Sequence, residues 1–355
     1  MVDEYSRSIE YLRVSLTREC NLNCLYCKGN KEKIKDFQGT DLSREEILRA
    51  VRAGAFLGVR KVRITGGEPL IRKDVIHICD DISRVEGIEK LGITTNGLRL
   101  PSLALELKKS GVEYVNISLD TLDKEKYAYL TGGGKLEEAL RGIDTALNMG
   151  FKKVKLNCVL IKGINDDEAS IRSLSKLSDK FNIDVRFIEL MEMPSSKTSG
   201  KKLFVPAVRV LECLEGIKEE TSYKECGDGI DKFFLSDTCE NLHKENIKAF
   251  RKEDYIDSDK NSVAKMYRVE GKRGRIGLIT PISHKFCDKC TRLRLTSDGY
   301  IKLCLHSPEE YMIRGLSEEE MREVFIKAIK NKPESHNMDE RSLSNSKRSM
   351  DRIGG

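Results

Sequence analysis

Two groups of cysteines are the residues of this sequence best suited to metal chemistry. The first group, Cys20, Cys24 and Cys27, has the spacing C-x3-C-x2-C, and no fourth Cys or His lies near it in the sequence. Three thiolates on one tight loop can hold three irons of a cubic [4Fe–4S] cluster, which leaves the fourth iron open to a small molecule. Catalytic zinc sites likewise keep one position open, whereas structural zinc sites are closed. We therefore expect an open iron–sulfur cluster here, since a zinc knot or a redox dithiol explains three cysteines less well.

The second group has the spacing C-x2-C-x13-C and again offers three ligands, Cys287, Cys290 and Cys304. Arg292 and Arg294 lie between them and alternate along a predicted strand, so both side chains point to the same side. Two guanidinium groups beside a metal centre favour an anionic or purine-bearing ligand. The pattern therefore predicts a second cluster next to a substrate site.

Zinc is the alternative for both groups. The second group with His284 or His306 would make a Cys3His site, and the protein would then be a non-catalytic binding module with two structural zinc ions. The two interpretations differ in metal content, because two cubanes bring about eight irons per chain and no zinc.

Composition narrows the class of protein. The chain has 355 residues, of which 34% are charged and 39% hydrophobic, and a formal charge of +6, as expected of a soluble globular protein. Basic residues are spread along the sequence without interleaved aromatics, so we expect no nucleic-acid partner. Without a signal-like start or an apolar run near ~20 residues, we expect a cytoplasmic protein that does not contact the membrane. Cysteines outside the two groups are expected to be core or loop residues: Cys79, Cys158, Cys213, Cys226 and Cys239.

The elements that must position these residues follow an alternating pattern up to about residue 190. Helical patterns such as 42–58 and 136–150 separate β-branched runs, which predicts parallel strands with right-handed crossovers. Such a sheet could be open and doubly wound or closed into a barrel. Polar residues follow the strands in turn, including "GGEP" (66–69) and "TTNG" (94–97), as at the active-site end of a barrel. We therefore predict an α/β fold, a partial (β/α)6 TIM-like barrel with strands at 11–17, 59–65, 90–96, 114–120, 153–161 and 184–190.

Beyond residue 200 the alternation ends. We predict two parts, a barrel domain over 1–200 and a C-terminal α+β extension over 201–355 that carries the second cluster and binds substrate. The segment 218–262 is polar and weakly patterned. The polar end, closing on Gly354-Gly355, is expected to be mobile unless it docks. Elements predicted in this part are a helix at 205–216, paired strands within 266–280, a hairpin within 286–305 turning at Asp298-Gly299, and a helix at 316–332.

Alternation within the strands also places cations inside the barrel. Arg13, Arg63 and Lys155 lie opposite Val and Leu neighbours, so they face inward if the apolar residues pack on the helices. A buried cation without a counter-charge is costly, and several together are best explained by a ligand with many negative charges, such as a triphosphate. The alternative is pairing with carboxylates of the chain, for which the candidates are Glu68, Asp120 and Glu189.

The first cysteine group, with Tyr26 directly before its third cysteine, resembles the signature of the radical S-adenosylmethionine (SAM) superfamily. "GGEP" after the next strand matches the segment that binds the methionyl amine of SAM in that superfamily. The resemblance implies that the cluster reduces SAM, and that a 5′-deoxyadenosyl radical then takes a hydrogen atom from the substrate.

Longer motifs narrow the resemblance to the GTP 3′,8-cyclases of molybdenum cofactor biosynthesis, from about residue 8 to the end. The likeness weakens over 218–262 and at 28–40, where "KGNKEKIKDFQG" stands in place of the usual Met-Pro. The motifs are "RITGGEPLIRKD" (63–74), "TTNGL" (94–98), "NISLDTLD" (116–123), "KGIND" (162–166), "VRFIELM" (185–191), "FCDKCTRLRLTSDG" (286–299) and the terminal Gly-Gly.

This resemblance implies two [4Fe–4S] clusters, SAM as cofactor and GTP as substrate. The radical would abstract the ribose 3′ hydrogen, and the carbon radical would attack guanine C8. One electron and one proton would then reduce the resulting aminyl-type radical to (8S)-3′,8-cyclo-7,8-dihydroguanosine 5′-triphosphate. A low-potential electron donor and a downstream pterin-precursor synthase are the implied partners, and a homodimer is left open. A peptide-modifying radical SAM enzyme with an auxiliary cluster is the alternative, although a peptide gives no reason for inward cations.

The resemblance also implies roles for individual residues. The metal ligands are the six cysteines of the two groups. The SAM contacts fall on Tyr26, Gly67, Ser118 and Met191. The GTP contacts fall on Arg13, Arg63, Thr94, Lys155, Arg292, Leu293 and Arg294. Catalytic residues fall on Arg13, Arg186, Gly354 and Gly355. Alternation puts Arg186 and Met191 on opposite faces of one strand, so either the strand ends between them or one role is wrong.

Overall fold

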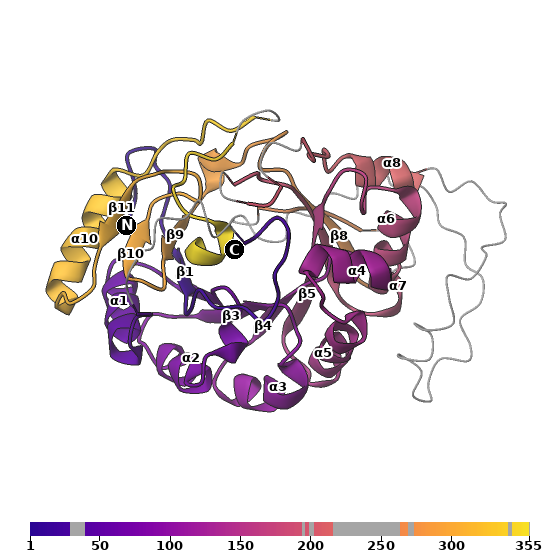
Figure 1. The fold of residues 1–355 in the computed structure, drawn as a ribbon. Coiled ribbons are helices and arrows are strands. Elements are labelled where there is room, and N and C mark those ends of the chain that lie inside the picture. Colours follow the sequence, from indigo (N-terminus) through magenta and orange to yellow (C-terminus); the bar gives the residue numbers. More distant parts are fainter. Residues whose placement is uncertain are drawn as a thin grey trace.

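A computed structural model describes residues 1–28, 40–193, 196–198, 202–215, 263–268, 273–339 and 343–354. Its strands form one curved sheet in the order β11-β10-β9-β1-β2-β3-β4-β5-β6-β8-β7, with helices around the outside (Figure 1). All six predicted barrel strands are confirmed: β1 (Tyr11–Ser15), β2 (Lys61–Thr65), β3 (Lys90–Thr95), β4 (Tyr114–Ser118), β5 (Lys153–Leu160) and β6 (Asp184–Glu189).

The C-terminal strands extend the same sheet at both edges. β9 (Arg292–Leu295) pairs in parallel with β1, and β8 (Arg275–Ile279) pairs in parallel with β6. The predicted antiparallel pairs are present, since β7 (Lys265–Tyr267) pairs with β8, and β10 (Tyr300–Lys302) with β9 and β11 (Glu310–Met312). Eight neighbouring strands are therefore parallel, and the sheet does not stop at residue 200.

The helices cover the outer face of the sheet. α1 begins at a capping box in which Ser43 and Glu46 each satisfy a backbone N–H of the other. No helix in the described ranges is both long and apolar enough to cross a bilayer. The helices are α1 (Arg44–Phe56), α2 (Val75–Ser83), α3 (Leu100–Lys109), α4 (Lys124–Thr131), α5 (Leu136–Asn148), α6 (Glu168–Ser175), α7 (Leu177–Lys180), α8 (Arg209–Glu215), α10 (Glu318–Lys330) and α11 (Met350–Ile353), with short 3-10 turns η2 (Pro69–Ile71) and η4 (Cys287–Lys289).

β5 shows how the sequence separates core from cavity. Its residues alternate between buried and half-buried, with Leu156 and Cys158 packed in the core and Lys155 and Asn157 on the inner face. Burying the apolar face against the helices leaves the polar face directed into the barrel. Cys79 and Cys213 are also core residues, as predicted, while Cys226 and Cys239 lie outside the described residues.

The C-terminal segment docks at the mouth of the barrel, where Figure 1 shows α11 (yellow) and the chain end. Arg348 anchors it, because its guanidinium donates to both oxygens of Glu310, at 2.7 and 2.8 Å, and to Asp298 at 2.7 Å. It also lies 4.7 Å from the ring centroid of Tyr300. The sequence predicts that the polar tail is mobile unless it docks. The structure shows that residues 343–354 are docked.

Candidate functional site

A cavity of about 360 Å³ runs through the barrel, from the loops at the carboxyl ends of the parallel strands, where the first cysteine group lies, to the amino ends of β1 and β9, where the second group lies. All six cysteines of the two groups line it, the first group from the loop after β1 and the second from residues before and after β9 and β10. The predicted cationic and polar residues lie between them: Arg13, Arg63, Thr94, Ser118, Lys155, Arg186, Arg292 and Arg294.

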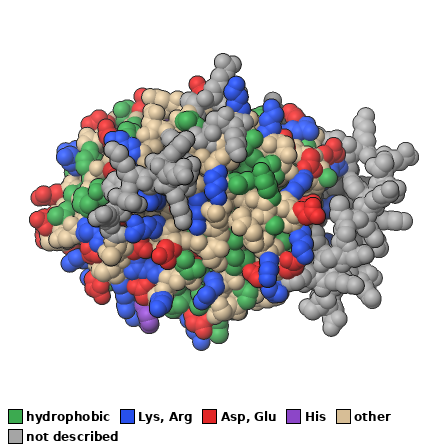
Figure 2. Space-filling view, viewed as in Figure 1, with side chains coloured by type: hydrophobic (Ala, Val, Ile, Leu, Met, Phe, Trp, Pro, Cys, Tyr) green, Lys and Arg blue, Asp and Glu red, His purple; other side chains and the backbone are tan. Residues whose placement is uncertain are grey.

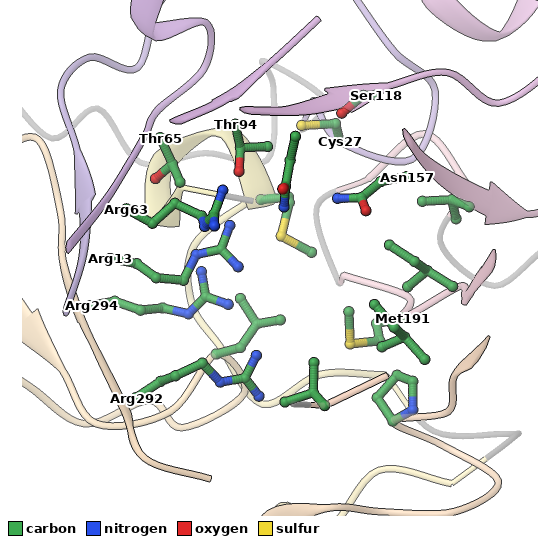
Figure 3. Close-up of a pocket in the computed structure, with 18 of the residues that line it drawn as sticks. Arg13, Cys27, Arg63, Thr65, Thr94, Ser118, Asn157, Met191, Arg292 and Arg294 are labelled. Carbon is green, nitrogen blue, oxygen red and sulfur yellow. The ribbon is translucent and has the colours of Figure 1, made fainter. Parts of the chain in front are cut away.

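Strand register builds a wall of arginines. Arg13 of β1 is aligned with Arg63 of β2 on one side and Arg294 of β9 on the other. One step along the same face, Tyr11 is aligned with Arg292. Figure 3 shows the four guanidinium groups from one wall directed into the cavity, with Asn157 and Met191 across from them. On the molecular surface seen in Figure 2, by contrast, Lys and Arg side chains are interspersed with Asp and Glu.

Burial disfavours the charged forms of these side chains. Desolvation, and then repulsion from Arg186 and Arg63, lower the pKa of Lys155 from 10.5 to about 6. Desolvation lowers the pKa of Arg186 to about 10, and that of Arg294 well below its usual value. Within the described residues, the buried Nε of Arg186 and Oγ1 of Thr94 meet no hydrogen-bond partner. The cavity therefore suits an anionic ligand with further polar groups.

The buried carboxylates accept hydrogen bonds from backbone N–H groups and hydroxyls rather than from the arginine wall. Glu68 accepts from the N–H groups of Asn96 and Leu70 and from Thr95 Oγ1. Glu189 accepts from Ala207, Ile282 and Ser283 backbone N–H groups. Asp120 accepts from Tyr26 and from the Val159 N–H. Pairing of the cations with these three carboxylates, the alternative considered from the sequence, is thus not what the structure shows.

The first cysteine group fits an iron–sulfur cluster through its donor chemistry and the packing of its loop. The three thiols are free, half-buried and directed to the cavity. Burial raises the pKa of Cys24 to about 12, so a cationic metal centre must supply the stabilisation that the thiolates need. A Cβ on Gly67 would lie 2.2 Å from the carbonyl oxygen of Glu19, so glycine is required for the "GGEP" loop to pack under the cysteine loop.

Tyr26 and Gly67, for which the resemblance predicts SAM contacts, line the cavity beside the first cysteine group. The Tyr26 hydroxyl donates to Asp120 Oδ2 at 2.6 Å, which fixes the aromatic ring between the cysteines and the end of β4. The Gly67 N–H donates to the Thr17 carbonyl at 2.6 Å. An amine needs an acceptor, so the Gly67 carbonyl is the atom suited to the methionyl amine of SAM.

The second cysteine group lies in a cationic environment. Burial opposes ionisation of Cys290, but Arg292 and then Lys332 more than offset it and lower its pKa to about 6. The guanidinium of Arg292 also lies 5.3 Å from the Phe286 ring centroid. These donors suit a metal centre that carries thiolates and meets an anionic substrate.

His306, one of the two histidines considered as a fourth zinc ligand, contacts a serine and another histidine. His306 shares a hydrogen bond of 2.9 Å with Ser344 through Nδ1, and its ring packs edge-on against His336 with centroids 4.8 Å apart. In the described part of the chain, no three Cys, His, Asp or Glu side chains form a group that could hold a single metal ion.

Most predicted site residues are brought together, with two exceptions. Leu293 lies fully buried in the core, so it could meet a substrate only through its backbone. Gly355 lies outside the described residues, whereas the Gly354 carbonyl accepts a hydrogen bond from Arg294. The conflict between Arg186 and Met191 is resolved because β6 ends at Glu189, and both residues line the cavity.

The sequence interpretation missed two kinds of cavity residue. Tyr11 accepts a hydrogen bond of 2.7 Å from Arg63 Nε, and its parity with Arg13 in β1 could have identified it. Lys332 and His336 follow α10 in sequence and reach the second cysteine group. No periodic pattern marks them, so only the tertiary structure could find them.

Comparison with known proteins agrees with this geometry. The chain matches the radical SAM superfamily over residues 14–174 and the family described as Molybdenum Cofactor Synthesis C over residues 232–338. Relatives named GTP 3′,8-cyclase from Peptoclostridium acidaminophilum and Alkaliphilus oremlandii (strain OhILAs) are both 40% identical over 358 residues, covering 100% of this chain and 98% and 100% of theirs. Among solved structures, SuiB of Streptococcus suis bound to S-adenosylmethionine has a TM-score of 0.53 at 17% identity. The match covers 86% of this chain and 61% of SuiB, and it shows a shared fold.

Proposed function

Because this chain belongs to the GTP 3′,8-cyclase family of radical SAM enzymes, we propose that it converts GTP to (8S)-3′,8-cyclo-7,8-dihydroguanosine 5′-triphosphate, the first step of molybdopterin precursor synthesis. The observation that carries the proposal is the row Arg63, Arg13 and Arg294, which lies between two open cysteine groups. Three aligned guanidinium groups match a triphosphate in charge and in hydrogen-bond geometry.

The cysteines and the SAM-side residues hold the cofactors. Two [4Fe–4S] clusters and SAM, when bound, supply the electron and the 5′-deoxyadenosyl radical that abstracts the ribose hydrogen. Ligation of the first cluster falls to Cys20, Cys24 and Cys27, and that of the second to Cys287, Cys290 and Cys304. Contacts to SAM fall to Tyr26, Gly67, Ser118 and Met191.

The remaining cavity residues orient GTP. Thr94 Oγ1 and the half-buried Lys155 are suited to polar atoms of the nucleotide, and the Leu293 contribution is limited to its backbone. Arg13 of β1 and Arg186 of β6 both line the cavity and would stabilise negative charge near the reacting ribose and base. Gly354, whose carbonyl accepts a hydrogen bond from Arg294, and Gly355, which lies outside the described residues, keep the catalytic role that the family resemblance implies.

The reaction implies partners beyond the cavity. A low-potential electron donor must reduce the first cluster, and a downstream pterin-precursor synthase must consume the cyclised nucleotide. The proposal places the enzyme in the cytoplasm, acting either alone or as a homodimer. A peptide-modifying activity is not favoured, because the arginine row suits phosphates rather than a peptide. The likeness to SuiB is one of fold and gives no support to such an activity.

An anaerobic turnover assay tests the function. After reconstitution with iron and sulfide, the enzyme is incubated with SAM and dithionite, with GTP or with ATP, and 5′-deoxyadenosine is measured by chromatography. We expect release that depends on GTP and a cyclised product of the same mass as GTP. A Cys24→Ser variant should release none, and the exposed Lys330→Met variant should match the wild type. Absence of GTP-dependent release from protein with about eight irons would refute the proposal.

A further inference from the structure

The N-terminal segment before β1 reaches the second cysteine group through one buried arginine. Arg7 is 5% exposed and pairs with Asp3 at 2.6 Å. Its Nη1 donates to the Cys287 carbonyl at 2.9 Å and to the Glu334 carbonyl at 2.8 Å, and its Nη2 donates to the Pro333 carbonyl at 2.8 Å. One guanidinium thus joins the first cysteine of the group to the segment that follows α10.

The segment that follows α10 also carries a buried lysine, which reaches the two segments that bear the other cysteines. Lys332 is 3% exposed, and its Nζ donates to the Arg292 carbonyl at 2.9 Å and to the Leu303 carbonyl at 2.7 Å. Arg292 lies two residues after Cys290, and Leu303 directly precedes Cys304. A single ammonium therefore fixes the distance between the other two cysteine-bearing segments.

From this arrangement we propose that Arg7 and Lys332 are positioning residues that assemble the second cysteine group to receive its cluster. The inference rests on the proposed function for the existence of that cluster. Arg7 holds the carbonyl of Cys287 itself, and Lys332 holds carbonyls within two residues of the other two cysteines. The two cations and the cysteines come from segments that are far apart in the sequence. Unlike the first group, whose three cysteines lie within eight residues, this group is drawn from two separate segments, and the two buried cations hold those segments together.

The charges agree with this role. Asp3 neutralises Arg7 through an ion pair of 2.6 Å, whereas Lys332 donates to two backbone carbonyls. A cluster with three thiolates adds negative charge at this point and stabilises the ammonium in return.

Metal loading, measured without turnover, tests the inference. Lys332→Met keeps the side-chain volume and removes both hydrogen bonds, and Arg7→Gln removes the link to residues 332–334. After anaerobic reconstitution we expect each variant to hold about four irons in place of about eight. The electron paramagnetic resonance signal of the second cluster should fall at least twofold, while that of the first cluster is unchanged. Lys330→Met, an exposed lysine two residues away, should load both clusters.

A Cys24→Ser background isolates the second cluster, because only the second group can then hold one. There, Lys332→Met should lose the cluster or shift its midpoint potential, whereas Lys330→Met should do neither. Unchanged signal and potential in both Lys332→Met and Arg7→Gln would overturn the inference. Loss of both clusters with loss of cooperative unfolding in both variants would also overturn it, since the residues would then support the whole fold. Wild-type protein lacking a second cluster would instead refute the proposed function.

Discussion

At the scale of single residues, the cavity holds cations at a cost that a bound anion would repay. Lys155 illustrates this, since its pKa of about 6 reflects burial first and repulsion from Arg186 second. With a pKa of about 6 the side chain is largely uncharged near neutral pH, and a bound triphosphate would favour its protonation. We therefore expect Lys155 to make GTP binding depend on pH.

We predict that GTP binding takes up a proton through Lys155. Affinity should fall as pH rises above about 6, by up to tenfold per pH unit, until the raised pKa of the complex is passed. Calorimetry in buffers of different ionisation enthalpy measures the proton uptake. Lys155→Arg should bind GTP without this dependence, because arginine stays charged.

The comparison with Lys155→Met isolates the lysine, because the phosphate of GTP titrates alike in both proteins. The native pKa of about 6 lies below the ordinary 10.5, so the unfolded chain binds more protons between these values. The unfolding free energy therefore rises with pH in this window, and Lys155→Met should raise the melting temperature at pH 7. Equal pH profiles for the wild type and Lys155→Met would contradict the prediction.

At the scale of elements, the docked C-terminal segment depends on one side chain. The Arg348 side chain is 2% exposed and binds Glu310 and Asp298 of the β9–β11 region. Docking brings Gly354 to Arg294 at the cavity mouth, where a Cβ on Gly354 would lie 2.3 Å from Thr65 Oγ1. Arg348 thus holds the segment whose end brings Gly354 to Arg294.

We predict that Arg348→Met releases this segment. Loss of hydrogen bonds to charged groups should weaken its docking by about 1.5–3 kcal/mol. Carboxypeptidase should then remove the terminal residues faster, as followed by mass spectrometry, and GTP-dependent 5′-deoxyadenosine release should fall at least tenfold with unchanged iron content. The neighbouring exposed Lys347→Met is the matched control. Normal protection of the segment in Arg348→Met would show that other contacts hold it.

At the scale of the whole molecule, one sheet joins the two predicted parts. β9 covers the free edge of β1, and β8 covers that of β6, so residues from beyond 200 complete both edges of the barrel. The boundary at residue 200 stays a prediction about sequence organisation. An unpaired edge strand is prone to aggregation, so the first part has reason to need the second.

We predict that the full chain unfolds in one transition, with the same midpoint by circular dichroism and by cluster absorbance under anaerobic conditions. A chain that ends at residue 200 should aggregate or lack a cooperative transition, because β1 and β6 would both be exposed edges. A soluble, cooperatively folding 1–200 fragment would instead make the predicted boundary a folding boundary.

The sequence alone determined the chemistry and the inner faces of the strands. Cysteine spacing predicted two ligand groups, which both line the cavity, and two-residue alternation placed Arg13, Arg63 and Lys155 there as well. These signals are local, because ligand spacing and side-chain direction depend only on neighbours in the chain. They are also sufficient for six strands and for the first residue of all but β2.

Only the tertiary structure decided which distant segments meet. Parallel pairing of β9 with β1 aligned Arg294 with Arg13, and buried hydrogen bonds brought Arg7 and Lys332 to the second cysteine group. Such contacts form when the sheet closes its edges and the last segments pack over it, and no periodicity in the sequence records them. The same packing sent Leu293 into the core while its neighbours Arg292 and Arg294 entered the cavity.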